Sequence, residues 1–419
     1  MRFLYILGAY KPKASANGLC SENVIQQLKA EGHSVKVISN LLRETPEYSR
    51  EADGTEIYRV GQRLSFRLKD FGEASHGKII GKLAFALAFF LNKLQLFCTA
   101  ASWPIVSRAT VRRFKRSALR LCETEAFDAV ISVYTPIESL LAGLEVKKKH
   151  PDIRFYPYFL DSLAFGYGPK YFSKEKTLAR GLAIEKRVFP FADKIILMKS
   201  SEEKQKKYNP EFADKFCFLD IPMFKRQNAM PQREDRKDES IKLLFVGSVS
   251  SRVRNPATLV SALAKVDDEN LSCEFIGRID CPQAFEILKK TYGERLTFTP
   301  FMPHEQLTEK LGEADILLNI GNLVSTMVPS KIFEYMSYGK PIISTYEIDG
   351  EPSVGYLRAY PYALLLDGKD SPELNAGKIK TFIKTTVGEH ADFDKLKSCF
   401  ILNTPEEFVR SVTEGRNPE

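Results

Sequence analysis

Residues 328–344 constrain the fold most, because their order requires a short helix to be followed directly by a buried strand. Pro329 fits the first turn of a helix, and Ser330 can cap backbone N–H groups that this turn leaves free. Gly339 can adopt the left-handed conformation that ends a helix, and Pro341 keeps the helix from continuing. The isoleucines that follow begin a β-branched run typical of a strand. The stretch therefore indicates an α/β fold.

Strand–helix–strand patterns recur in the first half of the chain. Strands are predicted over residues 2–8 and 34–39 with a helix between them, and a second set has strands over 127–133 and 153–160. Such units place their strands side by side in parallel. A chain of 419 residues is long enough for two domains. We therefore predict two Rossmann-like domains, each with a parallel sheet.

The domain boundaries are predicted from composition. A polar segment with two prolines and little periodicity separates the two halves, as expected of a linker. The prediction is an N-terminal domain over residues 1–220, a linker over 221–240, a C-terminal domain over 241–385 and C-terminal helices over 386–419.

Composition places the chain among soluble globular proteins of a reducing compartment. Hydrophobic residues make up 44% and charged residues 27% of the sequence. The seven cysteines include no CxxC pair, so we expect buried thiols and a cytoplasmic location. The apolar start of the chain ends at Gly8 and meets Lys11, which is too short for a signal peptide and fits a first strand.

Positive charge is concentrated in residues 59–120, which hold thirteen Lys and Arg against Asp70 and Glu73. This segment carries +11, whereas the rest of the chain sums to −3. Such an asymmetry predicts a surface for anions. Nucleic acid is not the expected partner, because the segment lacks the interleaved aromatic and basic residues of a stacking platform.

Within this segment, residues 83–91 form an apolar run between Lys82 and Lys93. A membrane-spanning helix needs about 20 apolar residues, so this run is too short to span. Apolar residues flanked by Lys and Arg suit a helix that lies in a membrane interface. The residues leave open the alternative of a core helix followed by a solvated basic helix.

The helix start at Ser330 can bind an anion, and Glu334 can accept hydrogen bonds from sugar hydroxyls. This motif resembles the nucleotide-sugar-binding motif of GT-B glycosyltransferases, the mostly retaining glycosyl transferases group 1, in which two Glu residues are separated by seven residues. The resemblance implies that Ser330 and Lys331 contact the donor and that Glu334 holds its ribose. Thr326 stands where the family has its first Glu. The residues leave open an ordinary helix–strand unit with Glu334 facing solvent.

Further motifs extend the resemblance along the first half. Residues 32–37 are similar to the family's Gly-His-x-Val-x-Val, and residues 185–193 resemble its Glu-Arg…Ala-Asp step. The resemblance implies that Gly18, at the end of a loop over residues 9–18, lies close to the donor diphosphate. It also implies a structural role for His33.

In the second half, the resemblance implies that residues after Gly247 contact the donor phosphates. Arg254 stands where the family has Lys and can bind phosphate through a bidentate fork. Ser248 replaces the family's Arg, so Arg252 is expected to supply the second charge, with a solvated loop charge as the alternative. The other expected donor-binding residues lie near the nucleotide base or in the glycine-containing loop before the helix: Phe301, Met302, Asn322 and Leu323.

Two residues are candidates for catalysis. Asp161 directly follows a predicted strand, and ligands of open α/β sheets gather at the carboxyl ends of strands. The family carries His or Arg before this Asp, but Leu160 stands here, so only Asp161 is carried over, as an acceptor-side carboxylate; helix capping is the alternative. Arg254 is the other candidate, because a cation stabilises a leaving diphosphate.

The resemblance implies a glycosyltransferase that moves a sugar from a UDP- or GDP-type nucleotide sugar to an acceptor hydroxyl, with retention of configuration. The N-terminal domain would bind the acceptor and the C-terminal domain the donor, and the last helices would cross back to the N-terminal domain. No DxD-type pair follows a predicted strand, so no metal or other cofactor is expected.

The acceptor and two other classes of protein stay open. If residues 59–120 are interfacial, we expect a lipid-linked saccharide or another polysaccharide precursor as acceptor, with the protein peripheral on the inner face of the membrane. The departures at Thr326 and Ser248 would also suit a non-catalytic nucleotide-sugar-binding partner subunit. A nucleotide-sugar epimerase with the GT-B fold is the second alternative.

Overall fold

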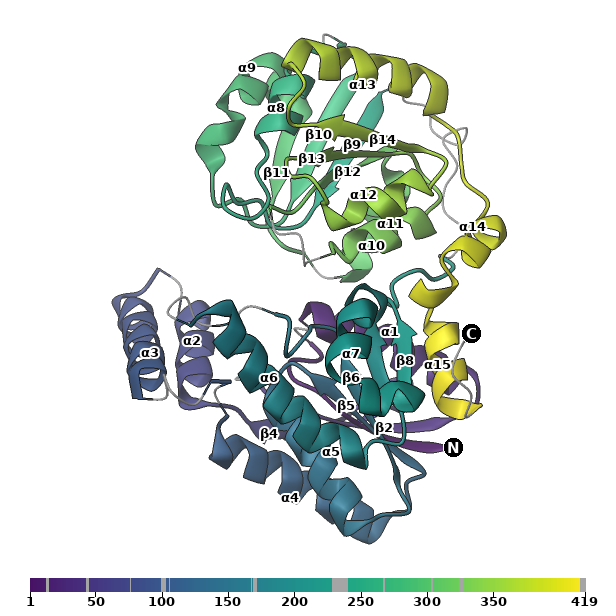
Figure 1. Ribbon diagram of the computed structural model, residues 1–419. Coiled ribbons are helices and arrows are strands. Elements are labelled where there is room, and N and C mark those ends of the chain that lie inside the picture. Colours follow the sequence, from purple (N-terminus) through teal and green to yellow (C-terminus); the bar gives the residue numbers. More distant parts are fainter. Residues whose placement is uncertain are drawn as a thin grey trace. The chain divides into compact units, whose positions relative to one another are not determined.

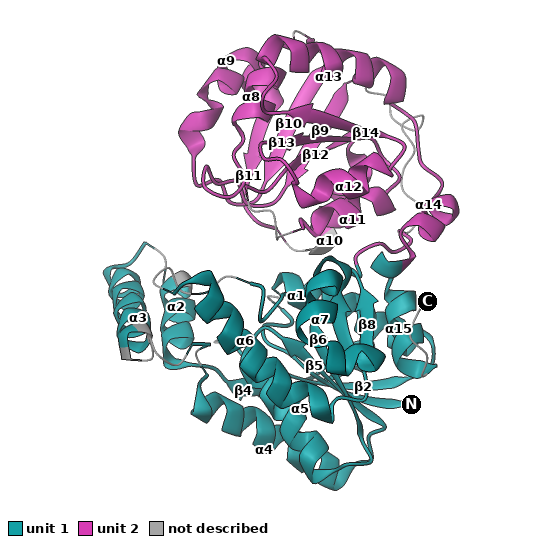
Figure 2. Cartoon of the chain, in the orientation of Figure 1, with its two compact units in different colours: residues 1–222, 402–419 teal, residues 223–401 magenta. Residues whose placement is uncertain are grey.

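The computed structural model describes residues 1–12, 15–42, 45–75, 77–98, 103–104, 106–166, 168, 172–227, 240–266, 268–302, 304–323 and 328–414. The chain divides into two compact units: unit 1 comprises residues 1–222 and 402–419, and unit 2 comprises residues 223–401 (Figure 2). Each unit holds one sheet flanked by helices (Figure 1). The predicted α/β class with two mainly parallel sheets is confirmed.

Unit 1 is built on an eight-stranded sheet. Its strands are β1 (Arg2–Ile6), β2 (Ser34–Leu41), β3 (Tyr48–Arg50), β4 (Glu56–Gly61), β5 (Ala129–Tyr134), β6 (Arg154–Phe159), β7 (Ile195–Met198) and β8 (Phe216–Leu219). Their order in the sheet is β3-β4-β2-β1-β5-β6-β7-β8. All neighbours are parallel except β3 and β4, which pair antiparallel at one edge.

Helices of unit 1 cover both faces of this sheet. They are α1 (Ala16–Ala30), α2 (Leu64–Ala74), α3 (Ile79–Cys98), α4 (Arg108–Thr124), α5 (Ile137–Lys149), α6 (Lys174–Val188), α7 (Glu202–Tyr208) and α15 (Pro405–Thr413). The exceptions are α2 and α3, which pack mainly on each other. Successive side chains of a strand point to opposite faces. Leu4 and Ile6 of β1 therefore share a core with α4 and α5, whereas Phe3 and Tyr5 share one with α1 and α15.

The chain ends in unit 1 rather than in unit 2. Phe408 and Val409 of α15 are buried in the core that α1 also enters, and the ring of Phe408 lies 4.8 Å from that of Tyr158. The backbone N–H of Asp220 donates to the carbonyl of Leu402 at 2.9 Å. The last helix thus covers part of one face of the first sheet.

Unit 2 is built on a six-stranded parallel sheet. Its strands are β9 (Ile241–Val246), β10 (Leu271–Ile276), β11 (Leu296–Thr299), β12 (Ile316–Ile320), β13 (Ile342–Tyr346) and β14 (Ala363–Asp367). Their order is β11-β10-β9-β12-β13-β14. The connections run one way from β9 and the other way from β12. This reversal makes the carboxyl ends of β9 and β12 the place where an open α/β sheet binds ligands.

The helices of unit 2 lie on both sides of this sheet (Figure 1). They are α8 (Ala257–Leu263), α9 (Glu286–Tyr292), α10 (His304–Glu313), α11 (Lys331–Ser337), α12 (Pro352–Arg358), α13 (Pro372–Thr386) and α14 (Phe393–Cys399). Met223 and Phe224, within the predicted linker over residues 221–240, are buried in this unit, and the Phe224 ring stacks on Phe393 at 4.7 Å. Residues 228–239 lie outside the described residues.

The apolar run of residues 83–91 lies on α3, whose main packing partner is α2 (Figure 1). The small side chains Ala84 and Ala88 are buried, but Phe89 and Phe90 are about 60% exposed. The alternative that this run is a core helix is therefore wrong. In the part of the chain that the structure describes, no helix has the length and apolar character needed to cross a bilayer.

The cysteines follow the expectation of buried thiols only in part. The side chains of Cys20, Cys217, Cys273 and Cys281 are buried. Cys399 is exposed, so the expectation is wrong there. Its place at the end of the short helix α14 explains the exposure, because only Leu396 of that helix is buried.

Candidate functional site

Two glycines bring the backbone close together at the carboxyl ends of β9 and β10. Gly247 and Gly277 directly follow these strands and have positive φ values of 152° and 129°. A Cβ atom on Gly277 would lie 2.1 Å from the carbonyl oxygen of Gly247, so a side chain at this position would collide with the backbone. Bare backbone therefore forms part of the edge at which ligands of such sheets bind.

Arg254 is a half-buried cation beside this backbone. A Cβ atom on Gly247 would lie 3.2 Å from its Nη1, which places the guanidinium against that glycine. Burial lowers the pKa of Arg254 from its ordinary value. Its Nε donates to Oδ1 of Asn322 at 3.0 Å, and no carboxylate among the described residues forms an ion pair with it. The charge of Glu351 acts on the guanidinium, but Glu351 forms no ion pair with it, so the guanidinium can bind an anion.

The loops that hold Arg254 and Asn322 are joined by backbone hydrogen bonds. The N–H of Leu323 donates to the carbonyl of Val253 at 2.7 Å, and the N–H of Asn322 donates to Oε1 of Glu351 at 3.2 Å. Glu351 is buried, and the sequence analysis missed it because no pattern marks a carboxylate that supports a loop. The structure thus brings together the predicted residues Arg254, Asn322 and Leu323.

The helix α11 brings Lys331 and Glu334 to the same edge. The ammonium of Lys331 forms an ion pair with Glu334, which is 3% exposed, so the alternative of a solvent-facing Glu334 is wrong. The hydroxyl of Tyr335 accepts a hydrogen bond from the N–H of Val246 at 2.9 Å. This bond fixes α11 beside the end of β9. Tyr335 was missed because a tyrosine on an apolar helix face looks like any core residue.

One expectation about the start of α11 is wrong, and another concerns a residue outside the described part of the chain. Ser330 precedes the helix, but its side chain makes no capping hydrogen bond, because the residue already has helical dihedral angles. The helix has seven residues, so its dipole is weak support for anion binding. Thr326, in the place of the family's first Glu, lies outside the described residues.

Three predicted donor-binding residues lie at the same end of the sheet with fewer contacts. Arg252 is exposed, and its backbone N–H donates to Oγ of Ser250 at 3.4 Å. Phe301 and Met302 follow β11, and the Phe301 side chain is 88% exposed. Among the described residues no hydrogen bond joins these side chains to Arg254. Their roles stay predictions.

In unit 1 the structure brings Gly18 and Asp161 together through a residue that the sequence analysis missed. Gly18 lies in the first turn of α1, not in the preceding loop as expected, because the Ser15 side chain caps the helix by accepting from the Gly18 N–H at 3.1 Å. Nδ2 of Asn17 donates to Oδ2 of the exposed Asp161 at 3.0 Å. Helix α6 is capped by Ser173, so capping by Asp161 is wrong.

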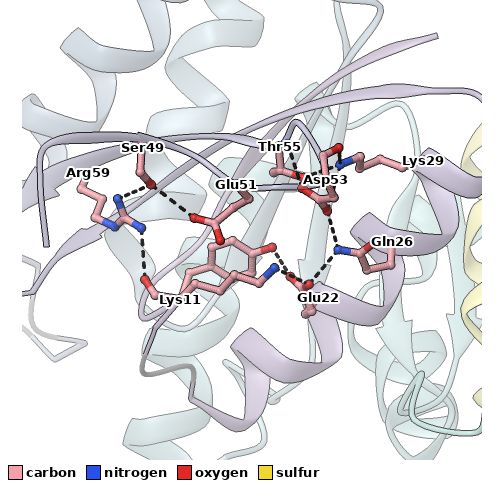
Figure 3. A network of polar contacts seen from close by, with 10 residues as sticks. Lys11, Glu22, Gln26, Lys29, Ser49, Glu51, Asp53, Thr55 and Arg59 are labelled. Atoms are coloured by element: carbon pink, nitrogen blue, oxygen red, sulfur yellow. Dashed lines mark hydrogen bonds and ion pairs between the residues drawn. The ribbon is translucent and has the colours of Figure 1, made fainter. Parts of the chain in front are cut away.

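A network of polar contacts holds the loop that leads into α1 (Figure 3). Glu22 of α1 accepts a hydrogen bond from the hydroxyl of the buried Tyr10 and pairs with Lys11 at 2.7 Å. Burial and the neighbouring Glu22 raise the pKa of Tyr10 well above its ordinary value. Arg59 of β4 donates to the Lys11 carbonyl at 3.3 Å. The loop before Gly18 is therefore anchored from two sides.

Known proteins resemble this chain in part of its sequence and in its fold. Residues 240–383 match the family described as Glycosyl transferases group 1. No curated protein matches the chain. The sucrose-phosphate synthase from Thermosynechococcus elongatus is 14% identical, with 99% of this chain and 97% of that chain covered and a TM-score of 0.59. The chain has the GT-B fold.

Two further solved structures share the GT-B fold with it. The UDP-forming α,α-trehalose-phosphate synthase from Burkholderia xenovorans, solved with glucose-6-phosphate, is 10% identical, with 99% of both chains covered and a TM-score of 0.59. WaaG, a glycosyltransferase involved in lipopolysaccharide biosynthesis, is 14% identical, with 98% of this chain and 99% of that chain covered and a TM-score of 0.54. These identities establish the fold of the GT-B protein and no more.

Proposed function

We propose that the chain is a glycosyltransferase that moves a sugar from a nucleotide sugar to an acceptor hydroxyl. The observation that carries the proposal is Arg254, a half-buried guanidinium that forms no ion pair with a described carboxylate and is held against the backbone at the ends of the central strands. It lies within residues 240–383, which match the glycosyl transferases group 1. A nucleoside diphosphate is the anion that such a site would hold in a protein of this family.

The donor site would work by electrostatic stabilisation of the leaving group. The bond between the sugar C1 and the diphosphate breaks, and the negative charge that develops on the diphosphate is balanced by Arg254 and Lys331. Glu334 accepts hydrogen bonds from the ribose hydroxyls, as the family resemblance implies. A UDP- or GDP-type donor and retention of configuration are part of the proposal. We also propose that no metal is needed, because fixed cations already supply the positive charge.

The acceptor side would lie in unit 1. The acceptor oxygen forms the new bond to C1, and its proton is taken by Asp161, an exposed carboxylate that Asn17 orients at 3.0 Å. The exposed apolar face of α3 and the basic segment over residues 59–120 favour an acceptor at a membrane surface. We therefore propose a lipid-linked saccharide or another polysaccharide precursor as acceptor, with the protein peripheral on the cytoplasmic face.

Substitution of Arg254 tests the donor site. UDP or GDP is expected to raise the melting temperature of the wild-type protein, because a ligand that binds only the folded state stabilises it. Arg254→Met should weaken this binding about tenfold or more, since a charge-assisted contact to phosphate is lost. Arg254→Lys should keep most of it, because Lys is also a phosphate-binding cation. The matched control is Arg358→Met, at an exposed arginine at the end of α12.

Unchanged UDP and GDP binding in Arg254→Met would overturn the proposal. The reaction products separate the two alternatives: an epimerised nucleotide sugar without acceptor would identify an epimerase, and binding without transfer or hydrolysis would identify a partner subunit. Because transfer needs an acceptor, the assay should offer membrane extracts and soluble saccharides with each nucleotide sugar.

A further inference from the structure

Helix α4 carries a row of arginines on one side. Arg113, Arg116 and Arg120 follow the i, i+3, i+7 spacing that places side chains on one helix face. Arg113 donates to the carbonyl of Gly61 at 2.9 Å. Arg116 and Arg120 are exposed, and neither side chain has a hydrogen bond or an ion pair to any described residue. Like charges at this spacing destabilise a helix. The arginine row therefore lowers the stability of α4, and no described contact of Arg116 or Arg120 compensates for this.

This row faces a groove of about 1240 Å³ that also involves α2 and β4. Arg67 of α2 lines the groove from the opposite helix and likewise has no described partner. Five arginines and three carboxylates line it, and one of these carboxylates, Glu125, is already paired with Lys36. Apolar side chains lie between the charges: Leu41, Leu42, Leu64, Leu68, Phe71 and Leu121.

The groove continues into a second hollow of about 440 Å³ that is lined by both polar and apolar residues. Leu64 and Arg67 line both spaces, and the second hollow adds Leu91 and Leu94 of α3. Leu94 is itself 45% exposed, and the same helix carries the exposed Phe89. A path therefore leads from the unpaired arginines to the apolar surface of α3. A ligand that follows it must carry negative charge at one end and a hydrocarbon at the other.

We propose that this groove binds a lipid phosphate or diphosphate. The phosphates would lie on the arginine row, and the hydrocarbon tail of the lipid would lie along α2 and α3. Guanidinium groups bind phosphate oxygens through paired hydrogen bonds. The leucines of α2 and α3 shield the first part of the lipid's hydrocarbon tail from water. This inference rests on the proposed function where the lipid carries the saccharide acceptor. The lipid phosphate or diphosphate is then the group to which the acceptor saccharide is attached.

Binding of farnesyl diphosphate to the full chain, measured by calorimetry below its micelle concentration, tests the inference. The affinity for farnesyl diphosphate should be higher than that for pyrophosphate by about tenfold or more, because the farnesyl tail adds buried apolar area. The double variant Arg116→Gln/Arg120→Gln should weaken its binding about tenfold or more. Leu94→Ser should weaken farnesyl diphosphate but not pyrophosphate.

The matched control is Arg108→Gln/Arg112→Gln, which changes two exposed arginines of α4 that do not line the groove. Equal affinity for pyrophosphate and farnesyl diphosphate would show an anion site without a lipid subsite and would overturn the inference. Wild-type affinity of Arg116→Gln/Arg120→Gln for farnesyl diphosphate would also overturn it. Stabilisation by UDP is measured on every variant. The unfolding transition of unit 1 is measured as well, because an unchanged transition shows that the unit carrying the substitutions is folded. If UDP stabilisation is retained, failure of lipid binding alone leaves the proposed donor site standing.

Discussion

Glu185 of α6 is a buried carboxylate that supports the segment after Asp161. Its Oε1 accepts a hydrogen bond from the N–H of Ala164 at 3.1 Å, and its Oε2 accepts one from Nδ2 of Asn209 at 2.9 Å. Burial nevertheless dominates and raises the pKa of Glu185 from 4.5 to about 7. The folded protein therefore holds this proton more tightly than the unfolded chain does.

The stability of unit 1 should accordingly fall as the pH rises through this window. Below pH 4.5 both states carry the proton, and between 4.5 and about 7 only the folded state does, so the free energy of unfolding decreases by about 3 kcal/mol across that range. Glu185→Gln removes the titration and should flatten this part of the profile. Oδ1 of Asn209 has no partner among the described residues, so rotation of that amide can serve the new side chain.

Urea unfolding of both proteins between pH 5 and 8, followed by circular dichroism, measures the difference. Glu185→Gln should gain on the wild type as the pH rises, because the wild type alone must bury an ionised carboxylate at high pH. A constant difference between the two proteins over the whole range would contradict the raised pKa. Glu203→Gln, at an exposed glutamate of α7, controls for the loss of one negative charge.

At the residue scale, the sequence predicted those site residues whose chemistry belongs to a short motif. Arg254, Asn322 and Glu334 were found in this way, and the structure brings the first two into contact. Tyr335 and Glu185 were not assigned a role, because burial alone turns a common side chain into an anchor or a shifted acid. Burial depends on residues far away in the sequence, so no local pattern reports it.

Helix α3 is the element whose surface departs most from that of an ordinary globular protein. Its large apolar side chains are exposed, and the helix carries Lys82 and Lys93 but no acidic residue. A bilayer interface would bury the apolar side chains and attract the lysines, with about 1 kcal/mol per basic residue near anionic lipid. The protein should therefore sediment with vesicles that contain anionic lipid.

The double variant Phe89→Ser/Phe90→Ser should reduce vesicle binding about tenfold or more, because two aromatic side chains no longer leave water. Binding of the wild type should also weaken with salt, and charge reversal of Arg112, Arg113 and Arg116 should abolish it. Ile287→Ser is the matched control, since Ile287 of α9 is an exposed apolar residue of unit 2. Wild-type sedimentation by the double variant would show that α3 does not contact the lipid.

At the element scale, the sequence predicted elements with strong local signals. The helix–glycine–proline–strand pattern was correct: α11 ends before Gly339, which has φ of 70°, and β13 begins at Ile342. The nine-residue apolar run was equally well placed on a helix, but its burial stayed open. Exposure is set by which elements pack on the helix, and among the described elements α2 is its main neighbour.

At the scale of the whole molecule, the chain forms two units with separate hydrophobic cores. The cores of unit 1 lie on the two faces of its sheet, and one of them contains residues from both ends of the chain: Phe3 of β1 and Phe408 of α15. The core of unit 2 is built from residues between Leu243 and Ile383. The sequence indicates two domains from length and repeated patterns, whereas the return of the last helix to the first domain was expected only from the family resemblance.

Separate cores should unfold in separate steps, since two-state unfolding is a property of single domains. Calorimetry of the full chain is expected to show two transitions. UDP should raise only the transition of unit 2, where Arg254 lies. Phe408→Ala should lower the transition temperature of unit 1 alone, because the cavity that it leaves beside Tyr158 reduces the free energy of unfolding of that unit by about 3–5 kcal/mol. If one transition responds both to UDP and to Phe408→Ala, the two cores unfold together and the assignment of independent units fails.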